Sequence, residues 1–430
     1  MYDLAIIGAG WAGFSAAQEA KKLGLKVILI EKDEIGGTCL NRGCIPTKTL
    51  IQSAKVHSLF KKSAKFGIEI TDSKINFSEI QKRKEAIVKQ LGKGMQSMLG
   101  DITFLKGVAQ FISTEELLVG ENKIKAKYII IATGSKPIEL ADLKFDGKKI
   151  ISSDDILNLN SIPDLLLIIG GGVIGCEFAS LFSILGTEVT IVELMPQLLP
   201  QEDKEIAKKL EALFKKKGIK VNTNTDAKTI NLGNYERVLL SIGRTPEIKN
   251  LNLEKIGIQT EKNKIVTNEY MNTNIPNIFA AGDCTGGKLL AHLAAHQGVT
   301  AVKNIYQPGH SKQIEPHLIP NCIFTEPEIA SIGITEEEAK NKGIESKTSK
   351  CDFLGSGMAR ILDETEGFIK IVSDKITDDI LGASIIGPKA TELIGIVTLA
   401  IQTHLKLSQL QNTIFAHPTL SESIQEAAKD

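Results

Sequence analysis

The sequence predicts an α/β fold with two Rossmann-like dinucleotide-binding domains, followed by a C-terminal α+β domain. Two stretches, one at the N-terminus and one near residue 165, each combine a strand, a glycine-rich turn and a helix. After Tyr306 the pattern changes, because Pro308-Gly309-His310 indicates a linker and no further glycine-rich nucleotide motif follows it. At 430 residues the chain is long enough for two to four domains.

The first stretch begins with a predicted strand at Leu4–Ile7, which runs into a glycine motif at residues 8–13. A helix is predicted to continue to about Leu23, and a second strand at Lys26–Ile30 ends on Glu31. The second stretch repeats this order at Leu165–Ile169, residues 170–175, Leu185, Glu188–Val192 and Glu193. In both stretches the acidic residue stands eighteen positions after the third glycine (13 to 31 and 175 to 193).

Each glycine of such a motif has a separate role in binding a dinucleotide. The first allows a tight turn, the second lets a pyrophosphate approach the backbone, and the third lets the helix pack closely on the strand. The helix N-terminus then faces the phosphates, and the acidic residue accepts hydrogen bonds from a ribose diol. A lone glycine motif often marks only turns, but the complete unit occurs twice, so we expect two bound dinucleotides. The glycines are Gly8, Gly10 and Gly13 in the first motif and Gly170, Gly172 and Gly175 in the second.

Glu193 also favours NAD over NADP as the second dinucleotide. Residues 193–198 (ELMPQL) contain no arginine or lysine that could pair with a 2′-phosphate. A carboxylate at this position would instead repel that phosphate.

Two further strands end in residues suited to nucleotide contacts. The strand Tyr128–Thr133 runs into Gly134, and the strand that starts at Ile278 ends in Asp283. Each could equally be an ordinary strand exit, and Asp283 could serve only to cap a helix over Leu289–Gly298.

The C-terminal third is predicted to be a separate α+β domain. Its strand-like runs and the amphipathic helices after them are Asn321–Ile332, Gly367–Val372, Ile380–Ile386, Lys389–His404 and Ser421–Ala428.

The composition indicates an ordinary globular protein. Its formal net charge is zero, so nothing suggests a nucleic-acid partner or an anionic membrane surface. The longest apolar runs are too short to span a bilayer, and no signal peptide precedes the first strand. Six cysteines in 430 residues do not make a secreted disulfide scaffold, so we expect a cytoplasmic protein.

A close pair of cysteines follows the first glycine motif, in the segment GGTCLNRGCIPTK at residues 36–48. On a regular helix Cys39 and Cys44 would lie about 140° apart around the axis, too splayed for a comfortable disulfide. Gly43 and Pro46 would let the chain distort there, and a helix that starts near Cys44 would stabilise its thiolate. A redox disulfide suits this pair, while half of a zinc site or two unpaired buried thiols are the alternatives.

Thiol–disulfide exchange needs a base, and His417 is the best candidate. It precedes Pro418, so its backbone is extended, and Glu422 is close enough in sequence to bind the imidazole and fix its tautomer. A His-Pro pair before a helix is also a common turn. His292 and His296 lie four apart on one helix face, but without an acidic or thiol partner a structural or cofactor-lining role is favoured over a metal site.

The order of these motifs resembles that of the class I pyridine nucleotide-disulfide oxidoreductases, and most closely the dihydrolipoamide dehydrogenases among them. The likeness covers essentially the whole chain, and its most specific parts are GGTCLNRGCIPTK and HPTLSE (residues 417–422). The segments LAH at 290–292 and FTEPEIA at 324–330 also look like the lipoamide enzymes. Glutathione reductases carry arginines for NADP where this chain has Glu193, mercuric reductases add a cysteine pair near the C-terminus, and soluble transhydrogenases usually lack the redox pair.

The resemblance implies an enzyme that oxidises dihydrolipoamide to lipoamide with NAD⁺, through FAD and a Cys39–Cys44 redox disulfide. Cys39 would be the thiol that the substrate attacks, and Cys44 the thiol next to the flavin. Lys48, paired with Glu177, would lie near the flavin N5. FAD would bind the first glycine motif, Glu31 and Asp283, and NAD the second motif and Glu193. Further implied cofactor-binding residues are Thr38, Thr133, Gly134, Gly243 and His292, and no metal is expected.

In this family the catalytic histidine comes from the partner subunit, so the resemblance implies a homodimer in which His417 and Glu422 complete the site of the other chain. The implied partner is dihydrolipoamide or a lipoylated carrier protein. The implied domains are the first part of an FAD domain at 1–145, an NAD domain at 146–262, a central segment that completes the FAD site at 263–312, and an interface domain at 313–430.

One departure from the family concerns the NAD domain. Between Val221 and Leu239 the family normally has a longer β-hairpin region, whereas only residues 222–238 connect the two strands here. Because the second glycine motif, Glu193 and the segment GRTP at 243–246 are present, NAD is still expected to bind.

Two other functions keep most of these features. An NADH-driven reductase of another disulfide would apply the same chemistry to a different substrate. A non-catalytic flavoprotein used as a binding module would not need Cys39, and the complete cysteine–histidine set argues against it.

Overall fold

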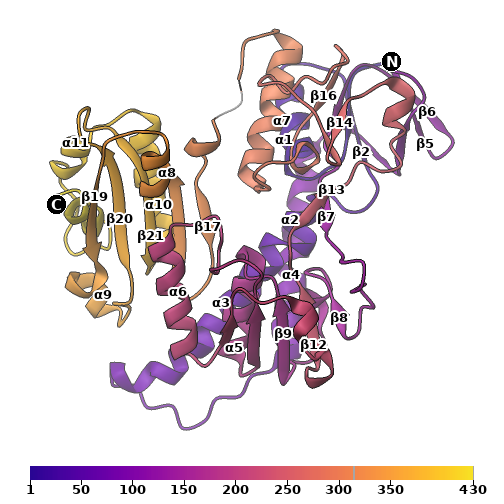
Figure 1. The fold of residues 1–430 in the computed structure, drawn as a ribbon. Helices are drawn as coiled ribbons and strands as arrows, with labels where there is room; N and C mark the ends of the chain where they lie inside the picture. Colours follow the sequence, from indigo (N-terminus) through magenta and orange to yellow (C-terminus); the bar gives the residue numbers. More distant parts are fainter. Residues whose placement is uncertain (313–314, 430) are drawn as a thin grey trace.

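A computed structural model describes residues 1–312 and 315–429 of the chain. Its three main sheets form separate bodies, and helices α3 and α4 descend from the first of them past the second (Figure 1). The predicted α/β fold with a C-terminal α+β domain is confirmed. The predicted boundary at 312/313 touches residues 313–314, which lie outside the described residues together with Asp430, and the other domain boundaries stay predictions.

The first sheet carries the first glycine motif. Its central strand β1 lies parallel to β2 on one side and to β6 on the other, and β16 pairs with β6. Helices α1 and α7 cross so closely that a Cβ on Gly298 would stand 2.1 Å from the Ala12 carbonyl oxygen. Helix α7 runs from Ala291 to Tyr306, which is beyond the predicted end at Gly298. The elements are β1 (Tyr2–Ile7), α1 (Trp11–Lys22), β2 (Val27–Glu31), β3 (Thr103–Lys106), β4 (Ala109–Phe111), β5 (Glu116–Val119), β6 (Asn122–Ile131), β16 (Ile278–Ala280) and α7 (Ala291–Tyr306).

The second sheet repeats the start of the first, with the strand order β11-β10-β9-β12-β8. Its β9 lies parallel to both β10 and β12, as β1 does to β2 and β6. The predicted internal repeat is therefore confirmed. The elements are β8 (Ile150–Ile151), β9 (Leu165–Ile169), α5 (Val173–Leu185), β10 (Glu188–Val192), α6 (Lys204–Lys216), β11 (Lys220–Asn222) and β12 (Arg237–Leu240). Outside this sheet, β7 (Ser135–Pro137) pairs with β13 (Arg244–Pro246), and β14 (Thr260–Glu261) pairs with β15 (Lys264–Ile265), whose Ile265 packs in the core of the first sheet.

The short connection between β11 and β12 helps to form the core of the second body. Residues 222–238, all of them described, contain two 3₁₀ turns at Ala227–Thr229 and Leu232–Asn234 and no hairpin. Apolar side chains of this connection pack on the buried core of β9, β10 and β12. The connection itself thus covers one face of the sheet. The covering side chains are Ala227, Ile230, Leu232 and Tyr235.

The third sheet is antiparallel, in the order β17-β18-β21-β20-β19. The predicted strands and both predicted helices are present, with α10 packed against β18 and β21. Strand β19 was not predicted, because its sequence SKTSKCD is polar throughout. The elements are β17 (Asn321–Ile323), β18 (Glu328–Gly333), α8 (Glu336–Asn341), β19 (Ser346–Asp352), α9 (Gly357–Ile361), β20 (Phe368–Asp374), β21 (Ile380–Gly387), α10 (Ala390–Gln402), α11 (Leu407–Gln411) and α12 (Glu422–Ala427).

Helix α3 (Cys44–Lys62) joins the three bodies through one stripe of lysines spaced seven residues apart. Lys48 Nζ lies 2.7 Å from Glu177 Oε2 of α5, and Lys55 Nζ lies 2.6 Å from Glu328 Oε1 of β18. Lys62 Nζ lies 3.6 Å from Glu326 Oε1. Residues seven apart share one helix face, so this face of α3 holds the second and third bodies together. The helices on either side of α3 are α2 (Gly37–Arg42) and α4 (Phe77–Leu99).

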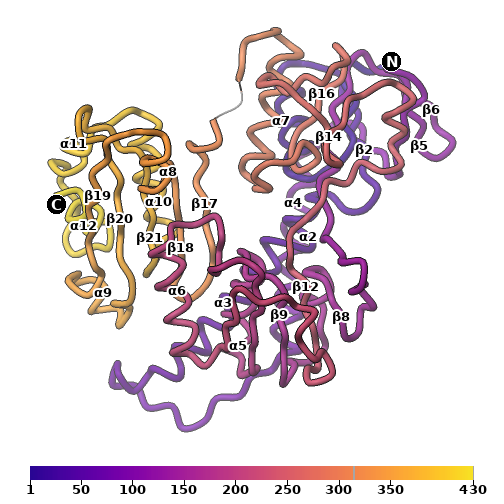
Figure 2. Tube along the Cα trace, in the orientation of Figure 1, coloured from indigo at the N-terminus to yellow at the C-terminus, as the bar shows by residue number. Residues whose placement is uncertain are grey.

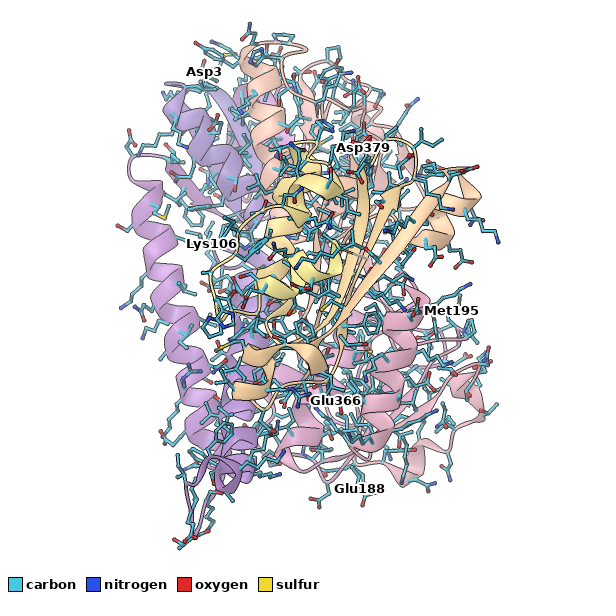
Figure 3. The ribbon with its side chains drawn as sticks, turned by 90° about the vertical axis from the view of Figure 1, so that its left-hand side faces the viewer. Asp3, Lys106, Glu188, Met195, Glu366 and Asp379 are labelled. Carbon is cyan, nitrogen blue, oxygen red and sulfur yellow. The ribbon has the colours of Figure 1, made fainter. Side chains whose placement is uncertain are left out.

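Ion pairs also fix the third sheet against α6. Lys370 of β20 is buried and its Nζ lies 2.9 Å from Asp203 Oδ2, at the N-cap of α6. Glu366, labelled in Figure 3 where the two bodies meet, accepts hydrogen bonds from Lys209 at 3.1 Å and Lys216 at 2.9 Å. A buried ammonium needs such partners, because an unpaired charge there would cost several kcal/mol, roughly 3–5.

Among the residues described, no helix combines the length and the apolar character that crossing a membrane requires. Within the same residues, no three His, Cys, Asp or Glu side chains gather as metal ligands would.

The third glycine of each nucleotide motif leaves no room for a side chain. A Cβ on Gly13 would stand 1.8 Å from the Gly8 carbonyl oxygen, and one on Gly175 would stand 2.0 Å from that of Gly170. We predict that Gly13→Ala destabilises the protein by about 1–3 kcal/mol or more, because backbone must move to admit the methyl group. Gly94→Ala on α4, where a Cβ meets nothing within 4 Å, is the matched control and should leave stability unchanged or raise it by roughly 0.5–1 kcal/mol. Denaturant unfolding of both variants measures this, and equal stabilities would contradict it.

Candidate active site

A continuous cleft of about 2300 Å³ opens between the three bodies. It is lined by Gly10 of the first glycine motif, Gly172 of the second and Asn321 of the third sheet. Pockets for one drug-sized ligand measure about 300–1000 Å³, so this cleft has room for two dinucleotides and a substrate.

The cysteine pair lies in this cleft, on either side of a break between two helices. Cys39 belongs to α2, which ends at Arg42, and Cys44 is the first residue of α3. Gly43 between them has φ −147° and ψ −114°, which is not a helical conformation. The predicted distortion is therefore at Gly43, whereas Pro46 lies inside the first turn of α3, where its missing N–H leaves no hydrogen bond unmade.

Both thiols are free, and each changes the acidity of the other. The pKa of Cys44 is lowered to about 7, first because the Cys39 thiol donates a hydrogen bond to its sulfur. Burial acts against this, and the cation of Lys48 lowers the pKa further. The pKa of Cys39 is raised, mainly because that hydrogen bond needs its proton and because the thiol is desolvated. Cys44 is thus the thiol prepared to carry negative charge at neutral pH.

Lys48 stands beside Cys44 with a fixed geometry. Its Nζ lies 2.9 Å and 2.7 Å from the two oxygens of Glu177, so the predicted pair is formed. The same ammonium lies 4.7 Å from the ring centroid of Phe324, whose backbone N–H donates to Glu177 Oε1 at 2.9 Å. Sequence reasoning had no role for the Phe324 side chain, because this contact joins segments far apart in the chain.

The two predicted ribose carboxylates occupy equivalent positions in the two halves. Glu31 Oε2 accepts from the Ala9 N–H at 2.7 Å, and Glu193 Oε2 accepts from the Gly171 N–H at 2.6 Å. Each also accepts a second backbone N–H through Oε1, from Asp33 at 2.8 Å and from Met195 at 2.7 Å. A carboxylate has about four lone-pair sites, so both can still accept from a ribose. They also hold their glycine loops in shape.

Asp283 reaches the cleft through a network that the sequence did not indicate. Its Oδ2 accepts from the Ser135 hydroxyl at 2.6 Å. Arg244 of β13 donates to the same hydroxyl at 2.9 Å and to the Ser135 carbonyl oxygen at 2.7 Å. Asp283 starts a 3₁₀ turn rather than capping α7, which begins at Ala291.

Five of the other predicted cofactor residues line the cleft, whereas Gly8, Gly13 and Gly175 lie behind it. The Thr133 hydroxyl is buried and has no hydrogen-bond partner among the described residues. His292 Nε2 lies 3.0 Å from the Pro320 carbonyl oxygen, and burial lowers its pKa. The five are Thr38, Gly134, Gly170, Gly243 and His292.

Arg42 of the cysteine loop pairs with a carboxylate near the end of β2. Its Nη2 lies 2.9 Å from Asp33 Oδ2. This pair ties the loop to the segment that follows Glu31.

The predicted base and its carboxylate are paired, but away from the cleft. His417 Nδ1 lies 2.9 Å from Glu422 Oε1, and the Thr419 N–H donates to Glu422 Oε2 at 2.8 Å. The Thr419 N–H and then His417 lower the pKa of Glu422. The His417 side chain is 81% exposed, and neither residue lines the cleft. In Figure 2, α12 and α2 lie on different sides of the third sheet. One chain therefore does not bring His417 to its own cysteines.

Comparisons with known proteins agree with this geometry. The family model for pyridine nucleotide-disulphide oxidoreductases matches residues 2–298, and the model for the dimerisation domain of the same family matches residues 319–428. A dihydrolipoyl dehydrogenase of Bacillus subtilis is 39% identical over 462 residues, covering 99% of this chain and 97% of that protein. One of Chlamydia pneumoniae is 42% identical over 446 residues, covering 99% and 96%.

Solved structures show the same likeness. LpdA from Mycobacterium tuberculosis superposes with a TM-score of 0.92 at 27% identity, covering 99% of this chain and 98% of that chain. The HOCl-induced flavoprotein disulfide reductase RclA from Escherichia coli has a TM-score of 0.89 at 29% identity, covering 99% of both chains.

The hydrogen bond from Cys39 can be tested through the titration of Cys44. Cys39→Ser keeps a hydroxyl donor, so the pKa of Cys44 should stay near 7, as in the intact pair. Cys39→Ala removes the donor, so less thiolate forms at neutral pH and the pKa should rise by about one unit. Ultraviolet absorbance of the thiolate, titrated between about pH 5 and pH 10, measures both, with the matching double variants that also carry Cys44→Ser as blanks. Equal midpoints for the two variants would contradict this role of Cys39.

Proposed function

Because the chain belongs to the pyridine nucleotide-disulphide oxidoreductase family, we propose that Cys39 and Cys44 form its redox disulfide. The chain is an NAD-dependent flavoprotein oxidoreductase that acts on sulfur groups, and its full-length likeness is to dihydrolipoyl dehydrogenases. The proposed reaction is the oxidation of dihydrolipoamide to lipoamide by NAD⁺. One observation carries this assignment: Cys44 has a pKa of about 7 at the start of α3, beside the Lys48–Glu177 pair.

The substrate exchange can be written with the residues of the chain. His417 of the partner subunit, held by its hydrogen bond to Glu422, removes a proton from one substrate thiol. The resulting thiolate attacks the Cys39 sulfur, the Cys39–Cys44 bond breaks, and Cys44 leaves as a thiolate. The second substrate thiol then displaces Cys39 and closes the substrate disulfide, and its proton passes to the Cys39 sulfur. Two electrons have passed from substrate to the cysteine pair.

Cys44 and Lys48 take part in the transfer of electrons from the substrate towards the flavin. A leaving thiol of low pKa departs faster, so the charge of Lys48 favours the exchange. Once Cys39 is a thiol again, its hydrogen bond stabilises the Cys44 thiolate. Glu177 keeps the Lys48 ammonium in place. Bound FAD supplies the two-electron relay from this thiol pair to NAD.

The residues present fit both dinucleotides. We propose that FAD is held by Gly8, Gly10, Gly13, Glu31 and Asp283, together with Thr38, Thr133, Gly134 and His292. We propose that NAD is held by Gly170, Gly172, Gly175, Glu193 and Gly243. In each motif a Cβ on the first or the third glycine would collide with backbone, whereas the second glycine, Gly10 or Gly172, has open space beside it in which a pyrophosphate could approach. Glu193 and the absence of arginine and lysine from residues 193–198 support NAD over NADP.

The homodimer follows from the family's dimerisation domain at residues 319–428. We propose that each active site uses the cysteines of one chain and His417 of the partner subunit. The physiological substrate is proposed to be a lipoyl group, free or on a carrier protein. The sparse cysteines support a cytoplasmic location.

The likeness to RclA, a disulfide reductase, supports an alternative in which the substrate is another disulfide. A reductase of another disulfide would use the same exchange in the reverse direction, passing electrons from NADH through the cysteine pair to the substrate disulfide. Comparing NADH-driven reduction of lipoamide with that of glutathione disulfide and cystine, on the same protein, separates the two. The proposed function predicts clear preference for lipoamide, and no preference would favour the alternative.

The shared active site predicts complementation between two inactive chains. Cys39→Ser and His417→Gln homodimers should each lose activity with dihydrolipoamide, His417→Gln by about 10²–10⁴-fold. A purified mixed dimer contains one site with an intact Cys39 and an intact His417, so it should recover about half of the wild-type activity. Two different affinity tags isolate the mixed dimer. If His417 acts within its own chain, every site of the mixed dimer is defective and activity stays at the level of the parent variants.

A further inference from the structure

The only tryptophan of the sequence, Trp11, stands inside the first glycine motif. The roles of the three glycines place no demand on the residue that follows the second glycine, and nucleotide binding does not require a bulky ring there. Trp11 is nevertheless half-buried at the start of α1 and lines the cleft that holds the cysteine pair.

Close backbone packing brings this ring to the cysteine loop. The Gly36 N–H donates to the Ala9 carbonyl oxygen at 2.8 Å. A Cβ on Gly37, which has φ +56°, would stand 2.8 Å from the Gly10 Cα. The glycine motif and the first turn of α2 are therefore in direct backbone contact. Trp11 follows Gly10, and Cys39 is two residues past Gly37.

The indole N–H of Trp11 has no conventional acceptor. Its Nε1 is buried, and none of the described residues accepts it with ordinary hydrogen-bond geometry. Indole is only a donor, and a buried donor without a partner costs about 1–3 kcal/mol. Trp11 is near enough to the Cys39 sulfur to change its acidity. Although the Cys44 thiol and burial raise the pKa of Cys39, the Trp11 N–H acts in the opposite direction.

We propose that Trp11 donates its indole N–H to the Cys39 sulfur and stabilises this sulfur whenever it carries negative charge. This inference rests on the proposed function, in which Cys39 exchanges with the substrate. When the second substrate sulfur attacks, the bond between the substrate and Cys39 breaks and its electron pair goes to the Cys39 sulfur. That sulfur is a thiolate until it takes up a proton. In the reverse direction the same thiolate is the nucleophile.

Different groups would then stabilise negative charge on the two cysteine sulfurs. Cys44 has the cation of Lys48, which favours a lasting thiolate. Cys39 has a neutral donor that is loosely aligned in the dithiol form and tightens as charge develops. Catalysis gains only from interactions that are stronger in the transition state, and this contact has that property.

Because the sequence has one tryptophan, the N–H can be removed without changing the shape of the ring. Benzothienylalanine, in which sulfur replaces the indole N–H, is incorporated at Trp11 in place of tryptophan. In the FAD-loaded Cys44→Ser protein, mass spectrometry of the peptide that contains Cys39 separates its alkylation by iodoacetamide from that of the four other cysteines, and the rate is followed against pH. We expect the rate at neutral pH to fall about three- to tenfold and the profile to move to higher pH, with FAD content unchanged. Trp11→Phe should give a similar shift, and the denatured proteins should react equally.

An unchanged alkylation profile in the benzothienylalanine protein would overturn the proposal, whatever its activity. The proposed function fails on a different result, namely turnover of dihydrolipoamide by Cys39→Ser. A fall in dihydrolipoamide turnover without a shift of the Cys39 profile would also count against the N–H donor, because loss of ring packing alone would produce it.

Discussion

The ion pair between Lys48 and Glu177 is the interaction on which the arrangement of the molecule most depends. It joins α3, which begins at Cys44, to α5, which follows the second glycine motif. Glu177 is almost fully buried, so its charge must be paired there. The pair therefore fixes the cysteine loop of the first body against the nucleotide cradle of the second. It also keeps a cation beside the thiol whose pKa is about 7. One contact thus serves both the assembly of the cleft and its chemistry.

Much of the fold could be predicted from the sequence because glycine has few substitutes at such turns. The positions of the strands around both motifs, and the acids Glu31 and Glu193, followed from spacing alone. Polar β19 carried no periodic apolar signal, and α4 was not anticipated although it is the longest of the named helices. The way in which the short connection between β11 and β12 folds could not be predicted from the sequence either. Residues 222–238 cover the sheet with side chains whose role depends on how the connection folds back.

Some residues of the candidate site could likewise be predicted from the sequence, and others could not. Cys39, Cys44, His417 and Glu422 were found because each stands in a motif, but the roles of Ser135, Arg244, Phe324 and Trp11 were not. These residues act across the packing of separate segments, such as the 109 positions between Arg244 and Ser135. No local pattern reports such a contact. The structure of one chain also leaves His417 exposed and away from the cleft, as the proposed sharing of each active site between two subunits requires.

The central claim is that electrons from a dithiol enter this protein through Cys39 and Cys44. Anaerobic addition of one equivalent of dihydrolipoamide to the FAD-loaded protein at neutral pH tests it most directly. The account predicts two new thiols per chain, found on Cys39 and Cys44 by alkylation and mass spectrometry. It also predicts the long-wavelength absorbance that a thiolate gives beside an oxidised flavin. Reduction of the flavin at an unchanged rate in a chain carrying both Cys39→Ser and Cys44→Ser would contradict it.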